Sequence, residues 1–193
     1  MLYRSFIALQ LSEASRYQLA ELADHYQTLD KYNEISWPAF DNYHLTLAFL
    51  GDQTPDDLQR LAEQLDYTVQ MNDNTAVTAS ELSYFPYHSR PSALAVMIHL
   101  DSNLERLKNQ VEQALRSSWV SYEKRKFIPH VTLGRIRGRK SPRLAVPPSY
   151  LNLELSCPAL SLYRSERRSD GAIYTPLYTM ETTPLDQVDD AWG

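Results

Sequence analysis

The stretch YHLTLAFLG at Tyr43–Gly51 has a counterpart far along the chain, PHVTLGRI at Pro129–Ile136. Each contains a His, one apolar residue, a Thr and a Leu in the same order. Because side chains alternate across a β-strand, the His and the Thr of each stretch share one face, and the apolar residues share the other. Both stretches therefore predict strands with one polar face and one core face. The polar residues are His44, Thr46, His130 and Thr132.

The segments before the two stretches also match each other. An apolar strand candidate, Phe6–Leu11, and a helix candidate that Ser12 can cap precede the first stretch. Another apolar candidate, Ala93–Leu100, and a helix candidate with the capping-box pattern Ser102…Glu105 precede the second. Two β-α-β units of nearly equal length, each ending in His-x-Thr, predict an internally duplicated fold.

A further helix is predicted between the two units. In the segment Thr54–Gln70, Thr54 can cap the first turn and Pro55 can occupy the first helical position. Composition does not shift between the units, so we expect a single bilobal domain over residues 1–184. The last residues, 185–193, are expected to form a polar tail.

The composition is that of an ordinary globular protein, with 43% hydrophobic and 22% charged residues among 193. No apolar run is long enough to cross a bilayer, and the N-terminus lacks the apolar stretch and cleavage site of a signal peptide. The lone Cys157 excludes an intrachain disulfide and a cysteine-based metal cage, and its apolar setting indicates packing. These features predict a cytoplasmic protein.

The net charge of −5 disfavours a general nucleic-acid coat protein, but the charge is unevenly distributed. The segment Lys124–Arg143 contains eight basic residues and no acidic one, and it encloses the second His-Thr stretch. A solvated basic loop is the usual interpretation of such a run. Its position around a strand that bears His and Thr adds the hypothesis of an anionic substrate.

Two opposed histidines suit phosphodiester chemistry, because in-line displacement puts the attacking and leaving oxygens on opposite sides of phosphorus. A neutral imidazole can take a proton from the attacking oxygen while a protonated imidazole gives one to the leaving oxygen. The Thr hydroxyls can hydrogen-bond the phosphoryl oxygens. This reasoning leaves open which His is the acid. A zinc site, the competing hypothesis, would need a third ligand that neither stretch supplies.

The remaining histidines lack this support. His25 lies in a polar helix and is expected at the surface, His99 ends a strand candidate, and His88 lies in a turn-rich loop. The sequence contains no glycine-rich phosphate loop and no Gly-x-Ser-x-Gly nucleophile elbow. The paired His-Thr stretches are therefore the main candidate for a functional site.

With their flanking residues, these stretches resemble the 2H phosphoesterase superfamily. The segments RSFIALQLSE, NYHLTLAFLGD, KFIPHVTLGRIR and LYRSERRSDGAIYTPLYTM are similar to the bacterial and archaeal RNA 2′,3′-cyclic phosphodiesterases, also called 2′-5′ RNA ligases. The resemblance implies an α+β, bilobal fold with two pseudo-symmetric antiparallel sheets around a cleft and helices outside. It implies hydrolysis of ribose 2′,3′-cyclic phosphates to 2′-phosphomonoesters without a metal or nucleotide cofactor, and in some relatives the reverse 2′-5′ ligation.

The resemblance also implies roles for individual residues. His44 matches the proton donor and His130 the proton acceptor, whereas Thr46 and Thr132 match phosphate-binding hydroxyls. Arg135 matches an arginine that often follows the second motif and could bind phosphate. In a regular strand Arg135 would lie opposite the His-Thr face, so it reaches the cleft only if the backbone bulges near Gly134.

We expect RNA ends or small cyclic nucleotides as substrates, no membrane partner and a monomer. Two alternatives stay open: a phosphodiesterase for another nucleotide diester, such as a 2′-5′ oligonucleotide or an ADP-ribose cyclic phosphate, and a non-catalytic RNA-binding module that uses the basic segment. Some aromatic residues could stack on a base, although packing in the core is the preferred interpretation of each. They are Tyr43, Phe49, Tyr84 and Phe85.

Overall fold

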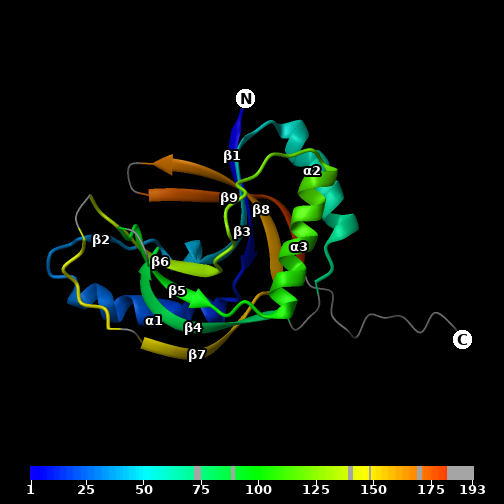
Figure 1. Cartoon of the computed structure of the whole chain (residues 1–193). Coiled ribbons are helices and arrows are strands. Elements are labelled where there is room, and N and C mark those ends of the chain that lie inside the picture. Colours follow the sequence, from blue (N-terminus) through cyan, green and yellow to red (C-terminus); the bar gives the residue numbers. More distant parts are fainter. Residues whose placement is uncertain (72–74, 88–89, 139–140, 148, 169–170, 182–193) are drawn as a thin grey trace, which may run out of the picture.

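The computed structural model describes residues 1–71, 75–87, 90–138, 141–147, 149–168 and 171–181 (Figure 1). Its helices are α1 (Glu13–Leu29), α2 (Pro55–Thr68) and α3 (Ser102–Ser117), with a 3₁₀ turn η1 (Phe40–Asn42). Its strands are β1 (Tyr3–Gln10), β2 (Ile35–Ser36), β3 (His44–Gln53), β4 (Ala76–Phe85), β5 (Ala93–Ile98), β6 (His130–Ile136), β7 (Ser149–Ser156), β8 (Ala159–Arg168) and β9 (Gly171–Glu181). Both His-Thr stretches form strands, as predicted.

The strands form one antiparallel sheet in the order β7-β4-β5-β6-β3-β1-β8-β9, with β2 paired to β6. Its two halves meet at β3 and β6, where Leu45 opposite Val131 is the pair that joins them. The two expected antiparallel sheets are therefore halves of a single sheet that is nearly divided at its centre. The predicted α+β fold with two similar halves is confirmed in this form, and both His-Thr strands lie at the junction.

Helices α1 and α3 cross between the two halves (Figure 1). Helix α1 follows β1 of one half but packs against β6 and β7 of the other, and α3 follows β5 but packs against β3 and α2. The segments after these helices also cross: β2 pairs with β6, and the Glu123 N–H donates to the Phe49 carbonyl, 2.8 Å away in β3. Each His-Thr strand is therefore bordered by chain from the opposite half.

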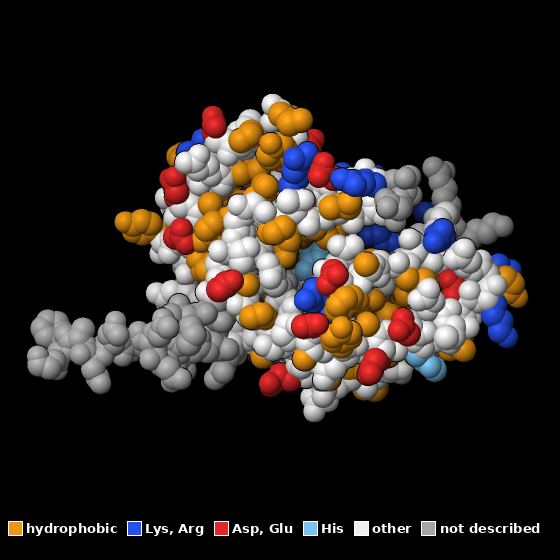
Figure 2. Space-filling view, turned by 180° about the vertical axis from the view of Figure 1, so that it is seen from behind, with side chains coloured by type: hydrophobic (Ala, Val, Ile, Leu, Met, Phe, Trp, Pro, Cys, Tyr) orange, Lys and Arg blue, Asp and Glu red, His pale blue; other side chains and the backbone are white. Residues whose placement is uncertain are grey.

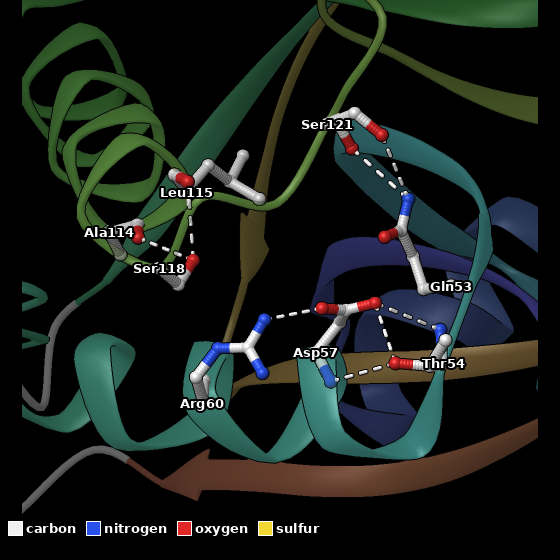
Figure 3. A network of polar contacts seen from close by, with 8 residues as sticks. All are labelled: Gln53, Thr54, Asp57, Arg60, Ala114, Leu115, Ser118 and Ser121. Atoms are coloured by element: carbon white, nitrogen blue, oxygen red, sulfur yellow. Dashed lines mark hydrogen bonds and ion pairs between the residues drawn. The ribbon is translucent and has the colours of Figure 1, made fainter.

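Side-chain caps fix where the helices begin. Ser12 caps α1, and Thr54 and Asp57 form a reciprocal capping box at the start of α2, with Pro55 in the first turn (Figure 3). The predicted cap of α3 was wrong by one residue. Asp101 caps this helix by accepting the Leu104 N–H at 2.8 Å, and Ser102 is its first helical residue.

The core lies between the sheet and the helices and is continuous through both halves. The leucines of α2 that the sequence places on one face, Leu58, Leu61 and Leu65, are buried in it. Cys157 is also buried, as predicted. None of the helices in the described ranges combines the length and hydropathy needed to cross a membrane. The domain bounds of 1–184 stay a prediction, because the proposed tail lies outside the described residues.

Candidate active site

The two motif histidines stand at equivalent places beside the junction of the halves. His44 is the first residue of β3 and His130 is the first residue of β6, one position before the joining pair Leu45 and Val131. The positive charge of a protonated His130 contributes to lowering the pKa of His44, so the two rings interact electrostatically. Figure 2 shows a histidine side chain recessed in a hollow of the surface, with Lys and Arg side chains nearby.

Each imidazole is oriented by the same backbone contact. His44 Nδ1 lies 2.7 Å from the Asn42 carbonyl oxygen, and His130 Nδ1 lies 2.7 Å from the Ile128 carbonyl oxygen. A carbonyl only accepts hydrogen bonds, so Nδ1 carries the proton in both rings. Nε2 is then the nitrogen that gains or loses a proton during a reaction. This pair of carbonyls, each two residues before its His, was not predicted from the sequence.

Burial keeps both imidazoles neutral in the free protein. The His44 ring packs against Phe6 and Tyr174, with ring centres 5.0 and 5.1 Å away. Burial, followed by the charges of Arg135 and His130, lowers the pKa of His44 to about 4. Burial also lowers the pKa of His130, with a smaller contribution from the charge of Arg135. At pH 7 both rings are therefore mostly neutral unless an anion binds beside them.

A β-bulge follows the Thr in each motif strand. In β3, Thr46 is opposite Ala8 while Ala48 is opposite Ile7, so Leu47 is an extra residue. In β6, Thr132 is opposite Ala95 while Gly134 is opposite the adjacent Leu94, so Leu133 is the corresponding extra residue. Both strands therefore bury two consecutive residues before the next side chain returns to the His-Thr face.

The bulges decide which later side chains share the face of the His and Thr residues. After the bulge, Arg135 is opposite Ala93, which shares the face of Ala95 and hence of Thr132. Its charge lowers the pKa of both motif histidines, as expected for a group that lies near them. The bulge that Arg135 needs in order to reach the cleft is thus present. The corresponding residue of β3 is Phe49, which is half exposed.

The four polar side chains predicted for the site share the cleft face of β3 and β6. Both motif Thr side chains are half-buried. In the part of the chain that the structure describes, neither Thr46 nor Thr132 uses its hydroxyl in a hydrogen bond, and Arg135 has no carboxylate partner. These groups can therefore donate hydrogen bonds to an anion in the cleft.

Aromatic side chains form most of the walls around the histidines, and sequence reasoning missed this. Phe85 stacks on His130 with ring centres 4.1 Å apart, and Phe6 stacks on Tyr163 beside His44. The core interpretation was correct for Tyr43 and Tyr84 but wrong for Phe49, which is half exposed, and for Phe85, which packs on His130 instead. The sequence signal that could have placed Phe49 is the small residue before it. Ala48 in LTLAF and Gly134 in VTLGR each follow the extra Leu of a bulge.

The described residues of the basic segment lie in different surroundings. Lys124, Arg125 and Lys126 lie in the exposed loop whose neighbour Glu123 bonds to β3, whereas Arg143 pairs with Glu34 and covers the Tyr32 ring. Only part of the run thus borders the motif strands. His25 is exposed, as predicted, and His88 lies outside the described residues. Among the residues described, no three His, Cys, Asp or Glu side chains gather as a metal-binding group.

Comparison with known proteins connects this geometry to one family. The chain matches the family model for LigT-like phosphoesterases over residues 9–95 and 98–174. The RNA 2′,3′-cyclic phosphodiesterase of Thermotoga maritima is 26% identical over 177 residues, which cover 91% of this chain and 93% of that protein. The enzyme of that name from Escherichia coli is 26% identical over 181 residues, covering 90% of this chain and 93% of its own length.

Solved structures agree with this match. E. coli LigT complexed with 3′-AMP superimposes with a TM-score of 0.75 at 25% identity, covering 95% of this chain and 99% of its own. The protein TT0787 of Thermus thermophilus has a TM-score of 0.77 at 23% identity, covering 92% of this chain and 97% of its own, which supports the fold alone. The family match spans both His-Thr strands and the helices that cross between them, and the chain therefore belongs to the LigT-like phosphoesterase family.

Proposed function

We propose that this protein is an RNA 2′,3′-cyclic phosphodiesterase that opens a terminal ribose 2′,3′-cyclic phosphate to a 2′-phosphomonoester. One observation carries the proposal: two imidazoles on duplicated strands flank the joining pair of the sheet, each with Nδ1 held by a carbonyl and Nε2 left for proton transfer. The relatives named RNA 2′,3′-cyclic phosphodiesterase support this substrate class.

In the proposed reaction, one neutral imidazole takes a proton from water as the water oxygen bonds to phosphorus. The bond between phosphorus and the ribose 3′ oxygen breaks, and the other imidazole, protonated, gives its proton to that oxygen. The resemblance assigns the donor role to His44 and the acceptor role to His130. Because the pKa of His44 is about 4 in the free protein, its proton must be stabilised by the anionic substrate.

The groups around the histidines suit the charge of this reaction. Thr46 and Thr132 can donate hydrogen bonds to the non-bridging oxygens, and Arg135 can neutralise the charge that develops there. Phe49 offers a half-exposed aromatic ring on the same face, on which a base can stack. The same residues support ring opening by a ribose 5′-hydroxyl in place of water, in which the bond between phosphorus and the 3′ oxygen breaks and a 2′-5′ linkage forms.

The test is incubation with an oligonucleotide that ends in a 2′,3′-cyclic phosphate, in the presence of EDTA, followed by determination of the phosphate position. We expect a 2′-phosphate and a loss of at least about a hundredfold in kcat for His44→Ala and for His130→Ala. His25→Ala, an exposed histidine of α1, is the matched control and should keep full activity. Wild-type turnover in either motif variant, with the fold intact by circular dichroism, would contradict the proposal.

A further inference from the structure

A second binding pocket adjoins the histidine site on the side of the first half. It has a volume of about 150 Å³ and includes His44 in its lining. The other walls come from the end of β1, the first turn of α1 with Arg16, the η1 segment with Asp41, and the β8–β9 pair with Tyr163 and Tyr174. A group in this pocket therefore lies next to the imidazole of His44.

Arg16 offers this pocket a hydrogen-bond donor without an acceptor. Its Nη1 donates to Asp41 at 2.8 Å, and its guanidinium lies over the Phe40 ring. Its Nε is buried and meets no acceptor among the described residues. A guanidinium keeps its charge under all ordinary conditions, so an unpaired buried Nε–H is costly. Arg16 lines the pocket, and Nη1 is the atom of its guanidinium that has an acceptor among the described residues, so the guanidinium has donors left for a ligand oxygen.

The electrostatics of the pocket favour an anion over a neutral group. The Asp41 side chain is 70% exposed, so water screens its charge, whereas the Arg16 side chain is only 25% exposed. Burial raises the pKa of Tyr163, and the positive charge of Arg16 is among the influences that oppose this rise, whereas no carboxylate contributes. The positive charge of Arg16 therefore acts on groups that line the pocket, although Arg16 is paired with Asp41.

We propose that this pocket binds a second phosphate of the substrate, the one on the 5′ side of the nucleotide whose cyclic phosphate is opened, through Arg16. This inference rests on the proposed function, because the second phosphate belongs to the same substrate. The source is either a terminal 5′-phosphomonoester or the phosphodiester that joins the last two nucleotides of an RNA chain. Arginine suits both, because its fork of N–H donors matches two phosphate oxygens.

Three substrates test the proposal: adenosine 2′,3′-cyclic phosphate, its 5′-phosphorylated form, and the dinucleotide ApA ending in a 2′,3′-cyclic phosphate. A second phosphate should raise kcat/KM about tenfold, the contribution of one partly exposed charge-assisted hydrogen bond. A gain for either of the last two substrates supports the pocket, and the one that gains identifies the source. Equal kcat/KM for all three substrates overturns it.

Arg16→Gln should abolish the gain, so that the ratio between the substrates with and without the second phosphate falls about tenfold. The matched control is Arg60→Gln, which removes a guanidinium that also pairs with an aspartate, Asp57, but on α2 (Figure 3). This control should keep the ratio. An equal loss on all substrates in Arg16→Gln would mean that Arg16 only supports the fold around Asp41, and it would overturn the proposal.

A binding measurement separates this inference from the proposed function. By calorimetry, adenosine 2′,5′-bisphosphate should bind wild-type protein about tenfold more tightly than 2′-AMP, and Arg16→Gln should bind the two equally. Equal binding by the wild type overturns the second-phosphate pocket even if all cyclic phosphates are hydrolysed. Conversely, absence of turnover on every substrate contradicts the proposed function, while a bisphosphate preference that depends on Arg16 still supports the pocket.

Discussion

At the scale of single residues, the two histidines differ in their surroundings although their backbone contacts are the same. His44 is enclosed by aromatic rings on several sides, with Phe6, Tyr163 and Tyr174 within 6.3 Å between ring centres. His130 has one such neighbour, Phe85, among the residues that the structure describes. Because the rings exclude water, protonating His44 costs free energy unless a negative charge lies nearby. A bound anion should therefore raise the pKa of His44 more than that of His130.

The pKa of His44 is expected to rise when a phosphomonoester binds. In the free protein it is about 4, and a phosphate anion within a few ångströms should raise it by about two pH units. Titration of the His44 ring signals by NMR, with and without 2′-AMP, measures the change. The exposed His25 is an internal reference for effects that do not depend on the cleft. If His44 keeps its low pKa in the complex, it cannot be the proton donor at neutral pH.

Arg135→Gln should change the pH dependence of activity as well as its size. The Arg135 charge lowers the pKa of both histidines, so its removal raises both. One ring must be protonated in the reaction, and kcat/KM falls when that proton is lost at high pH. The alkaline limb of the kcat/KM profile should therefore move to higher pH, while the maximum falls about tenfold through the lost phosphate contact.

The control for this variant is Arg137→Gln, two residues along the chain. Arg137 donates through Nε to the Ile35 carbonyl, and its charge is not among those that act on the motif histidines. Its replacement should leave the alkaline limb in place. An alkaline limb that moves to lower pH in Arg135→Gln would contradict the inferred position of the Arg135 charge.

At the scale of elements, the paired bulges place the side chains that follow each Thr. The residue after the extra Leu is Ala48 in β3 and Gly134 in β6. Because Ala occupies this position in β3, the bulge itself accepts a Cβ. Glycine is needed in β6 for a local reason: a Cβ on Gly134 would overlap the Cγ2 of Ile35 in β2 and crowd Trp37. Strand β2 therefore depends on Gly134 for its close approach.

Gly134→Ala should destabilise the protein by about 1–3 kcal/mol, the usual cost of a methyl group forced into a packed site. The measurement is the free energy of unfolding from urea denaturation. Adding Ile35→Ala removes the overlapping Cγ2, so the double variant should be less destabilised than the sum of the single changes. Strict additivity of the two changes would show that the overlap does not limit this site.

Much of this arrangement followed from the sequence, and the rest depended on packing. The alternation in HLTL and HVTL placed His44 and His130 beside their Thr residues correctly, because period-two patterns define strand faces. The pattern could not place Arg135 or Phe49, since one extra residue in a bulge reverses every later side chain. The cap of α3 was misplaced because Asp101 and Ser102 both suit that position, and only the backbone decides between them.

At the scale of the whole molecule, the two halves of the sheet hardly touch through their strands, but their helices and connections cross. Among the described residues, Leu45 with Val131 is the only pair through which β3 and β6 are joined as sheet strands. Helix α1 and the β2 segment instead cover the second half, and α3 and the Glu123 segment border the first. The position of His44 relative to His130 thus depends on elements exchanged between the halves.

Because each half is covered by elements that follow strands of the other half, we expect the two halves to unfold together. Leu162→Ala in β8 removes a buried side chain of the first half and should cost about 2–5 kcal/mol. Trp37, which packs near Gly134 of the second half, reports on the other half when Trp119 and Trp192 are replaced by Phe. In urea, Leu162→Ala should shift the Trp37 fluorescence transition and the far-ultraviolet circular dichroism transition to the same lower midpoint, because a two-state protein loses all structure at once.

A Trp37 transition that keeps its original midpoint would mean that the second half is stable alone. The position of His44 relative to His130 would then not depend on the crossing helices.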